Sequence, residues 1–456
     1  MKQYTYVIIG ALLGSLGLTG CDKYLDVQPK GKTLLTTVTN YDQWLNDPSL
    51  ATGYSPSTCT ANLLSDNYDY PGIATPAMQL GELVYTWAPQ FSSDLTASPL
   101  FWAEHYAKIN QYNTVLLGID EATGGTSIQK NSLKGEALLG RALEYFYLIN
   151  EYGKSYDSST AQKDLAVPFV ISNQVVQDIP PRGTVADITN QIITDLNIAI
   201  PNLPDDNSAN RYRASKAAAY SVLARVYFYA RNYAEARKNA ALALANSKAV
   251  MVDYNGTLPA SNVLAVRPDV IYGRLVIGNA AASLDFMRTF AANDLRLKKL
   301  YSSSDGYKFT TRGATVFYPG AVTGVLIYEN TGTSVQEMKL IVAEAAARNN
   351  ELTVALQQLD EVRKTRITAA SYVAFQSNDP EEVLKEVLLE RRHELAYCGL
   401  RWFDMRRLDM ENRMDTVKRY DAVGNVVATL PPHSNSYTLQ IPAQVLTYHP
   451  DMPQNP

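Results

Sequence analysis

The chain has 456 residues, which is enough for a large core and for two or three ordinary domains. Hydrophobic residues make up 46% and charged residues 19%, as is typical of a globular protein. With 41 basic against 45 acidic residues, the chain lacks the excess of lysine and arginine that nucleic-acid binding requires, so we expect no nucleic-acid partner.

The first 20 residues have the pattern of a signal peptide. Lys2 precedes an apolar run over residues 4–18, which is too short and too rich in glycine for a good membrane span. The run ends at Leu18-Thr19-Gly20-Cys21, and small residues before a cysteine resemble the bacterial lipobox. This pattern predicts acylation of Cys21 and cleavage before it, although an ordinary signal peptide followed by a chance cysteine is the alternative.

Residues 21–40 then read as an extended, lipid-anchored tether, and residues 41–456 as a single domain with dispersed helical repeats. A short helix is expected over 41–47, with Asp42 near its cap. A further helix is predicted over 101–120 from the inward spacing of its apolar residues.

Helical repeats are the main organising feature. Residues 215–247 read as two short helices, in which Ala224, Ala236 and Ala243 allow close approach while larger residues fill the space beside them. This order over about 34 residues is the tetratricopeptide pattern, with Arg231 at the usual glycine between the helices. An ordinary helical hairpin is the alternative.

One such repeat cannot bury its own apolar face, so neighbouring repeats are required. The sequence predicts a second one at 334–366. A third is split between helices 131–152 and 184–200, and a fourth lies in 380–408.

The stretches between the helices look irregular. Residues 51–100 are rich in Tyr, Pro, Ser, Asp and Asn, residues 249–333 lose helical periodicity, and residues 415–456 contain a predicted turn at Gly424-Asn425. The predicted fold class is therefore mainly α, with tetratricopeptide-like helix pairs packed against an irregular, loop-rich lobe.

No catalytic pattern stands out. His393-Glu394 begins a zinc-protease motif, but Tyr397 stands where the second histidine ligand belongs, so His393 is predicted to lie on a helix surface. Neither a nucleophile elbow nor a dinucleotide fingerprint occurs. We therefore predict a non-enzymatic protein with no cofactor and no metal site. Cys59 and Cys398 are expected to be buried free thiols, with one bridge as the alternative.

Several segments together resemble the SusD/RagB-like family of nutrient-binding outer-membrane lipoproteins. They are the start at Cys21-Asp22-Lys23-Tyr24-Leu25-Asp26, GEALLGRALEYFYLINEYG at 135–153, ERRHELAYCGLRWFDMRR at 390–407, and the final IPAQVLTYHPDMPQNP. The shared residues look structural. Arg401 and Asp404 are expected to pair on one helix turn, whereas Glu390, Arg391 and Glu394 should tie the last helices to the repeats.

The resemblance implies a lipoprotein anchored at the cell surface in the outer membrane by its N-terminal lipid. It would capture an oligosaccharide and deliver it to a TonB-dependent, SusC-like transporter. The alternatives are capture of peptides, a non-enzymatic repeat scaffold and a surface hydrolase.

We expect the ligand to contact the irregular regions 62–100 and 294–320, because sugars stack on aromatic rings and their hydroxyls bond to carboxylates, amides and guanidinium groups. The candidate residues are Asp66, Asn67, Tyr68, Tyr70 and Trp87 in the first region, and Arg296, Tyr301, Tyr307 and Tyr318 in the second.

The first testable prediction concerns the N-terminus. Intact-mass analysis of protein extracted from membranes should show a chain that begins at Cys21 and carries acyl groups. A mass that includes residues 1–20 would contradict the lipobox interpretation.

Overall fold

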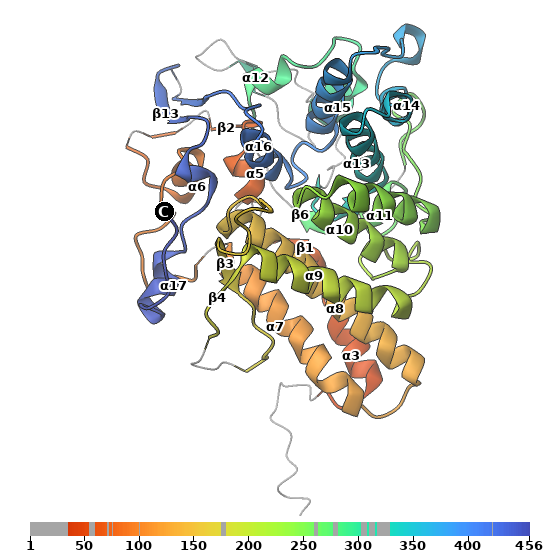
Figure 1. Ribbon diagram of the computed structural model, residues 1–456, viewed down its shortest axis with the longest axis vertical. Coiled ribbons are helices and arrows are strands. Elements are labelled where there is room, and N and C mark those ends of the chain that lie inside the picture. Colours follow the sequence, from red (N-terminus) through yellow and green to blue (C-terminus); the bar gives the residue numbers. More distant parts are fainter. Residues whose placement is uncertain are drawn as a thin grey trace, which may run out of the picture.

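The computed structural model describes residues 35–53, 60–70, 73–74, 76–99, 101–174, 179–259, 263–276, 281–301, 308–309, 315–316, 329–421 and 423–456 (Figure 1). Cys21, Cys59, Tyr307 and Tyr318 lie outside these residues. Within them, no helix is both long enough and apolar enough to cross a membrane.

Helices dominate, as the sequence predicts. They are α3 (Val38–Leu45), α4 (Pro48–Ala51), α5 (Thr60–Leu64), α6 (Leu80–Tyr85), α7 (Trp102–Gly118), α8 (Ser127–Tyr152), α9 (Val185–Ala199), α10 (Lys216–Tyr229), α11 (Tyr233–Asn246), α12 (Leu284–Met287), α13 (Val335–Arg348), α14 (Leu352–Arg363), α15 (Pro380–Glu394), α16 (Arg401–Asp409) and α17 (Ala443–Tyr448).

The longer helices form one stack. Each packs on the next in the order α7, α8, α9, α10, α11 and α13, and α13 also contacts α14 and α15 (Figure 1). The predicted pairs at 215–247 and 334–366, and the split pair of α8 and α9, are therefore confirmed.

The turn between α10 and α11 explains how arginine replaces the usual glycine. Arg231 has φ of +60°, in the left-handed region that glycine adopts most easily, and Asn350 has φ of +59° at the equivalent turn between α13 and α14. Ala224, Ala236 and Ala243 are fully buried. These small side chains let the paired helices approach closely, as the repeat pattern predicts.

Two helix predictions need correction. The first helix begins at Val38 rather than 41, because the Thr37 side chain, and not Asp42, accepts from the Asn40 backbone N–H as its N-cap. The stretch 380–408 does not form a packed repeat pair, since α15 packs on α13 and α14 while α16 packs on α5.

Short strands occur between the helices, some packed on the helix stack and some in the irregular lobe. The pairs are β2 (Tyr68–Asp69) with β7 (Ala281–Ala282), β3 (Leu165–Pro168) with β4 (Arg182–Thr184), β5 (Val270–Tyr272) with β11 (Thr333–Ser334), β8 (Lys308–Phe309) with β9 (Thr315–Val316), and β12 (Val417–Tyr420) with β13 (Val426–Leu430). All five pairs are antiparallel. A three-stranded sheet has the order β1 (Thr52–Gly53), β6 (Leu275–Val276), β10 (Glu329–Asn330), with β1 parallel to β6.

The predicted turn at Gly424-Asn425 lies between β12 and β13, where Gly424 has φ of +95°. This hairpin lies on one side of the molecule together with β2, α5 and α6, beside the end of the helix stack that carries α15 (Figure 1). Segments from the start and the end of the chain thus meet in the lobe.

The second prediction tests the repeat packing. Replacing Ala236 with Leu should overpack the interface of α11 and lower the free energy of unfolding by about 1–3 kcal/mol in a urea titration. Ala241→Leu, at an exposed position of the same helix, is the control and should change stability little. Equal stability of the two variants would argue against this packing.

Candidate functional site

Asp66 and Tyr68 are the two predicted ligand residues that line the same cavity. It measures about 610 Å³ and lies between β2, the segment 283–288 that contains α12, and residues 413–420 and Gly424 of the segment that contains the β12–β13 hairpin. Arg392 of α15 and Arg401 of α16 complete it. The neighbouring Asn67 is buried, and its amide oxygen accepts a hydrogen bond of 2.8 Å from Arg392 Nε.

Tyr70 and Trp87 lie beside this cavity and do not line it. Tyr70 is half-buried, and its ring centroid is 6.3 Å from that of Tyr68. Trp87 is buried, and its indole N–H donates to the Leu64 carbonyl over 3.0 Å. Trp87 therefore supports the loop that carries Asp66 from the inside of the lobe.

Arg296 and Tyr301, the two described candidates of the second predicted region, do not line this cavity. Arg296 is only 1% exposed and forms ion pairs with Asp294 and Glu390, each at 2.7 Å, and with Glu394 at 3.0 Å. Tyr301 is buried, with its ring 5.7 Å from Phe290. Both side chains are enclosed in the protein interior, and a ligand role for them stays a prediction.

The floor of the cavity is built around the Asp66 carboxylate. Arg401 binds it in a bidentate fashion, with both N···O distances at 2.7 Å, and Arg392 Nη2 lies 3.2 Å from the same carboxylate. Burial alone would raise the pKa of Asp66, but the two guanidinium groups hold it well below its usual value. The cavity therefore contains a permanently ionised carboxylate in a fixed orientation.

This pairing corrects one expectation. Arg401 does not pair with Asp404, although the two residues share a helix turn. Asp404 instead faces the interior, where it accepts from Arg391 at 2.9 Å and from Arg407 at 2.8 Å. Arg401 lies at the first turn of α16, from which its side chain reaches the loop that carries Asp66.

Arg419 of β12 holds that loop from beneath. It is buried and donates to the carbonyl groups of Leu64 at 3.1 Å and Ser65 at 2.8 Å. Its guanidinium also stacks on the rings of Tyr85 and Trp87, 4.6 and 4.4 Å from their centroids. Because it donates to successive backbone carbonyls, Arg419 fixes the backbone around Asp66.

The expected contacts between α15 and the repeats are confirmed. Glu390 pairs with Arg363 of α14 at 2.8 Å, and Arg391 donates to the Tyr229 hydroxyl of α10 at 3.0 Å. Glu394 pairs with Arg366 at 2.6 Å. These contacts tie α15 to the repeats.

His393, however, is not a surface residue. It is buried, its ring stacks 4.0 Å from that of Phe290, and Nε2 shares a 2.7 Å hydrogen bond with the Thr289 hydroxyl. Burial and the nearby Arg296 lower its pKa to about 3, so it stays neutral at physiological pH. No group of three or more His, Cys, Asp or Glu in the described part of the chain is placed to hold a metal ion.

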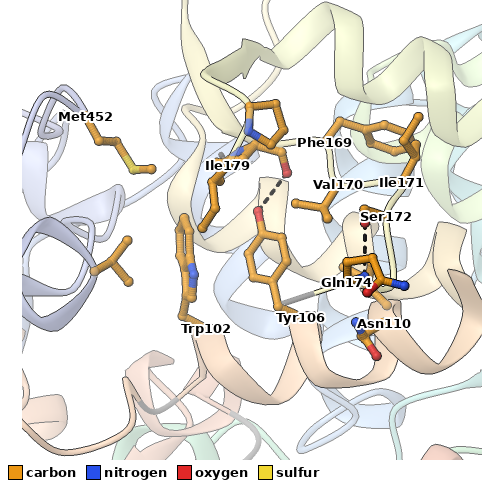
Figure 2. A pocket seen from close by; sticks show the side chains of 14 residues that line it. Trp102, Tyr106, Asn110, Phe169, Val170, Ile171, Ser172, Gln174, Ile179 and Met452 are labelled. Carbon is orange, nitrogen blue, oxygen red and sulfur yellow. Dashed lines mark hydrogen bonds between the residues drawn. The ribbon is translucent and has the colours of Figure 1, made fainter. Parts of the chain in front are cut away.

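A second cavity of about 650 Å³ has the opposite chemistry. It lies between α7, the segments 168–174 and 179–180, and the C-terminal residues Val445 and Met452, and Trp102 and Tyr106 form its aromatic wall (Figure 2). The Tyr106 hydroxyl donates its hydrogen to the Pro168 carbonyl at 2.7 Å, so this hydrogen is not available to a ligand. This apolar cavity suits a hydroxyl-rich ligand less well than the cavity around Asp66.

The sequence interpretation missed most of the polar cavity. Arg392 and Arg401 belong to the ERRHELAYCGLRWFDMRR segment, for which only structural roles are predicted. Arg288, Lys418 and Arg419 carry no local signal, because single basic residues among 41 cannot be assigned to a site. They become recognisable only when the hairpin and α12 are brought together.

Two family models match the chain. One, described as starch-binding associating with outer membrane, matches residues 23–228, and the SusD family model matches residues 336–456. The chain therefore belongs to the SusD/RagB-like family.

Solved structures share the fold. A putative sugar binding protein from Bacteroides vulgatus is 21% identical with a TM-score of 0.73, over 93% of this chain and 99% of that one. A SusD superfamily protein from Bacteroides thetaiotaomicron is 18% identical with a TM-score of 0.74, over 92% and 100% of the two chains. A SusD-like carbohydrate binding protein from Bacteroides vulgatus is 18% identical with a TM-score of 0.70, over 91% and 97%. No curated protein matches the chain.

The third prediction tests the ion pair at the floor of the cavity. Arg401→Gln should lower the free energy of unfolding by about 2 kcal/mol at pH 7, because Asp66 loses two charge-assisted hydrogen bonds. Arg237→Gln, which breaks the more exposed pair with Glu351, is the control and should cost under about 1 kcal/mol.

The effect should also depend on pH. Since the pKa of Asp66 lies below its ordinary value of 3.8 in the native state, the stabilisation is complete above that value and is lost as the pH falls toward the native pKa. Urea titrations should therefore show the difference between parent and Arg401→Gln narrowing below about pH 4. A difference that is constant from pH 7 to pH 2 would contradict this assignment.

Proposed function

We propose that the protein is a nutrient-binding lipoprotein of the cell surface that captures an oligosaccharide in the cavity around Asp66. The observation that carries the proposal is the Asp66 carboxylate, held by Arg401 and Arg392 at the floor of a cavity of about 610 Å³. Sugar hydroxyls donate to carboxylates and accept from guanidinium groups, and this cavity offers both. Its volume is within the range of small-ligand sites.

An aromatic ring next to these charges strengthens the proposal. Tyr420 lines the same cavity and is half-buried, and the C–H face of a sugar packs favourably on such a ring, whereas the lining rings of Tyr68 and Tyr85 are buried. Asp66 and Tyr68 are the two residues of the predicted set that serve here as direct ligand contacts. Asn67 and Trp87 serve as supports behind them, through Arg392 and the Leu64 carbonyl.

Membership of the family supports the remaining parts of the proposal. The protein is anchored in the outer membrane through a lipid on Cys21 and delivers its ligand to a TonB-dependent, SusC-like transporter. The stack of helices from α7 to α15 provides a rigid body that holds the lobe with the cavity in place during this transfer.

Asp66 does not suit the acid role that a surface hydrolase of the glycosidase type requires. A glycosidase needs a carboxylic acid that gives up a proton near neutral pH. The pKa of Asp66 is held far below that range by Arg392 and Arg401, and both of its oxygens accept from Arg401. Peptide capture is the competing ligand class, because a peptide carboxylate would also bond to the arginines.

The fourth prediction tests the location of the site. The soluble mature chain is first screened against a panel of glycans and peptides, and the ligand found is titrated by calorimetry. Arg392→Gln should weaken binding at least about tenfold, since it removes a charged donor from the cavity. Ile171→Ser is the control, because Ile171 lines the apolar cavity and is 63% exposed.

Circular dichroism should show that both variants are folded. Unchanged affinity of Arg392→Gln, or loss of binding in Ile171→Ser, would place the ligand elsewhere. If the screen returns a peptide as the ligand, the proposed ligand class is a peptide and not an oligosaccharide.

A further inference from the structure

The cavity around Asp66 is basic, although the protein as a whole is acidic. Its ionisable lining consists of the basic residues Arg288, Arg392, Arg401, Arg413, Lys418 and Arg419, and of the acidic residues Asp66, Asp69, Asp285 and Asp415. The whole chain has a formal net charge of −4. The lining therefore has two more basic than acidic residues, the opposite balance to that of the whole chain.

Some of these cations are already compensated. Arg413 is paired with Glu381 and Glu411, which lie outside the cavity lining. Arg401 uses Nε and Nη2 on Asp66, and Arg392 uses Nε on Asn67 and Nη2 on Asp66. The Nη1 groups of Arg392 and Arg401 make no hydrogen bond to any described residue.

Two further basic side chains are available to pair with a ligand. Arg288 follows the last turn of α12, and Lys418 lies on β12, so the two come from different sides of the cavity. Both side chains are exposed, and neither forms an ion pair within the part of the chain that the structure describes. Four basic side chains, from the end of α12 and from α15, α16 and β12, thus have N–H donors without an acceptor among the described residues and line one cavity.

Unused donors of this kind are matched by a ligand rich in negatively charged acceptors. We propose that the captured oligosaccharide is an acidic one, whose carboxylate or sulfate groups pair with Arg288 and Lys418 while its hydroxyls bond near Asp66. The inference rests on the proposed function and specifies the ligand class of that same site. Charge-assisted bonds to such anionic groups are roughly twice as strong as neutral ones.

The exposed carboxylates of Asp285 and Asp415 set the specificity of this arrangement. They add negative charge to the rim of the cavity and accept hydrogen bonds from sugar hydroxyls. A simple anion without hydroxyl groups gains nothing from them and meets their repulsion. An acidic sugar, which carries both an anionic group and hydroxyls, satisfies both sets of side chains.

The experiment compares ligands that differ only in charge. Calorimetry measures binding of the mature chain to oligogalacturonides and to their methyl esters, and, in a second arm, to a sulfated galactan oligosaccharide and its desulfated form. The acidic member of at least one pair should bind about tenfold or more tightly than its neutral counterpart. This preference should shrink as salt rises from 50 to about 500 mM, because exposed charges are screened.

Variants then assign the preference to the two cations. Arg288→Gln and Lys418→Gln, singly and together, should abolish most of the preference for the acidic ligand, because they should weaken binding of the acidic form far more than binding of the neutral form. Lys238→Gln, at an exposed lysine of α11 remote from the cavity lining, is the control. Both cavity positions are exposed, so the variants should fold like the parent, as circular dichroism will show.

The outcomes separate the inference from the proposed function. Equal binding of the acidic and neutral forms, or a preference that survives in the double variant, overturns the acidic ligand while oligosaccharide capture stands. Binding of no glycan from either arm, or from the wider panel, overturns both. If the acidic form is preferred in just one of the two arms, that arm identifies the anionic group as a carboxylate or as a sulfate.

Discussion

Buried arginine–carboxylate pairs hold this structure together, because they join elements that are far apart in the chain. Arg225 of α10 is fully buried and binds Glu337 of α13 through two hydrogen bonds of 2.7 Å. Arg407 of α16 reaches Glu344 of α13 in the same way. Removing one partner of such a pair leaves an uncompensated charge in the interior, which costs about 3–5 kcal/mol. The relative placement of the helices is therefore closely specified.

The same kind of interaction shapes the candidate site. Asp66 and Arg401 are separated by 335 residues, yet their bidentate pair fixes the loop of the early chain against α16. Arg419 adds backbone contacts beneath that loop. The cavity is thus pre-organised by groups that are buried or nearly so, and its exposed cations remain available for a ligand. Pre-organisation of this kind lowers the entropy lost on binding.

The division of the chain into a helix stack and a lobe separates stability from recognition. The stack buries small apolar side chains such as Ala236 beside larger ones. Because such an interior is closely packed, a change of side-chain volume at these positions lowers stability. The lobe is built from strands of two to five residues, held by individual side-chain contacts. Exposed residues such as Arg288 and Lys418 can vary without disturbing the core. This arrangement lets one fold present different ligand-binding surfaces.

The sequence by itself determined the helix pairs, because apolar residues at helical spacing and small alanines act locally. It also pointed to the family and to the region around Asp66 and Tyr68. Only the tertiary structure decided that Arg401 pairs with Asp66 rather than Asp404, that His393 and Arg296 are buried, and that Arg288 and Lys418 share a cavity. Such pairings depend on segments hundreds of residues apart, and no local periodicity records which of 41 basic residues meets which of 45 acids.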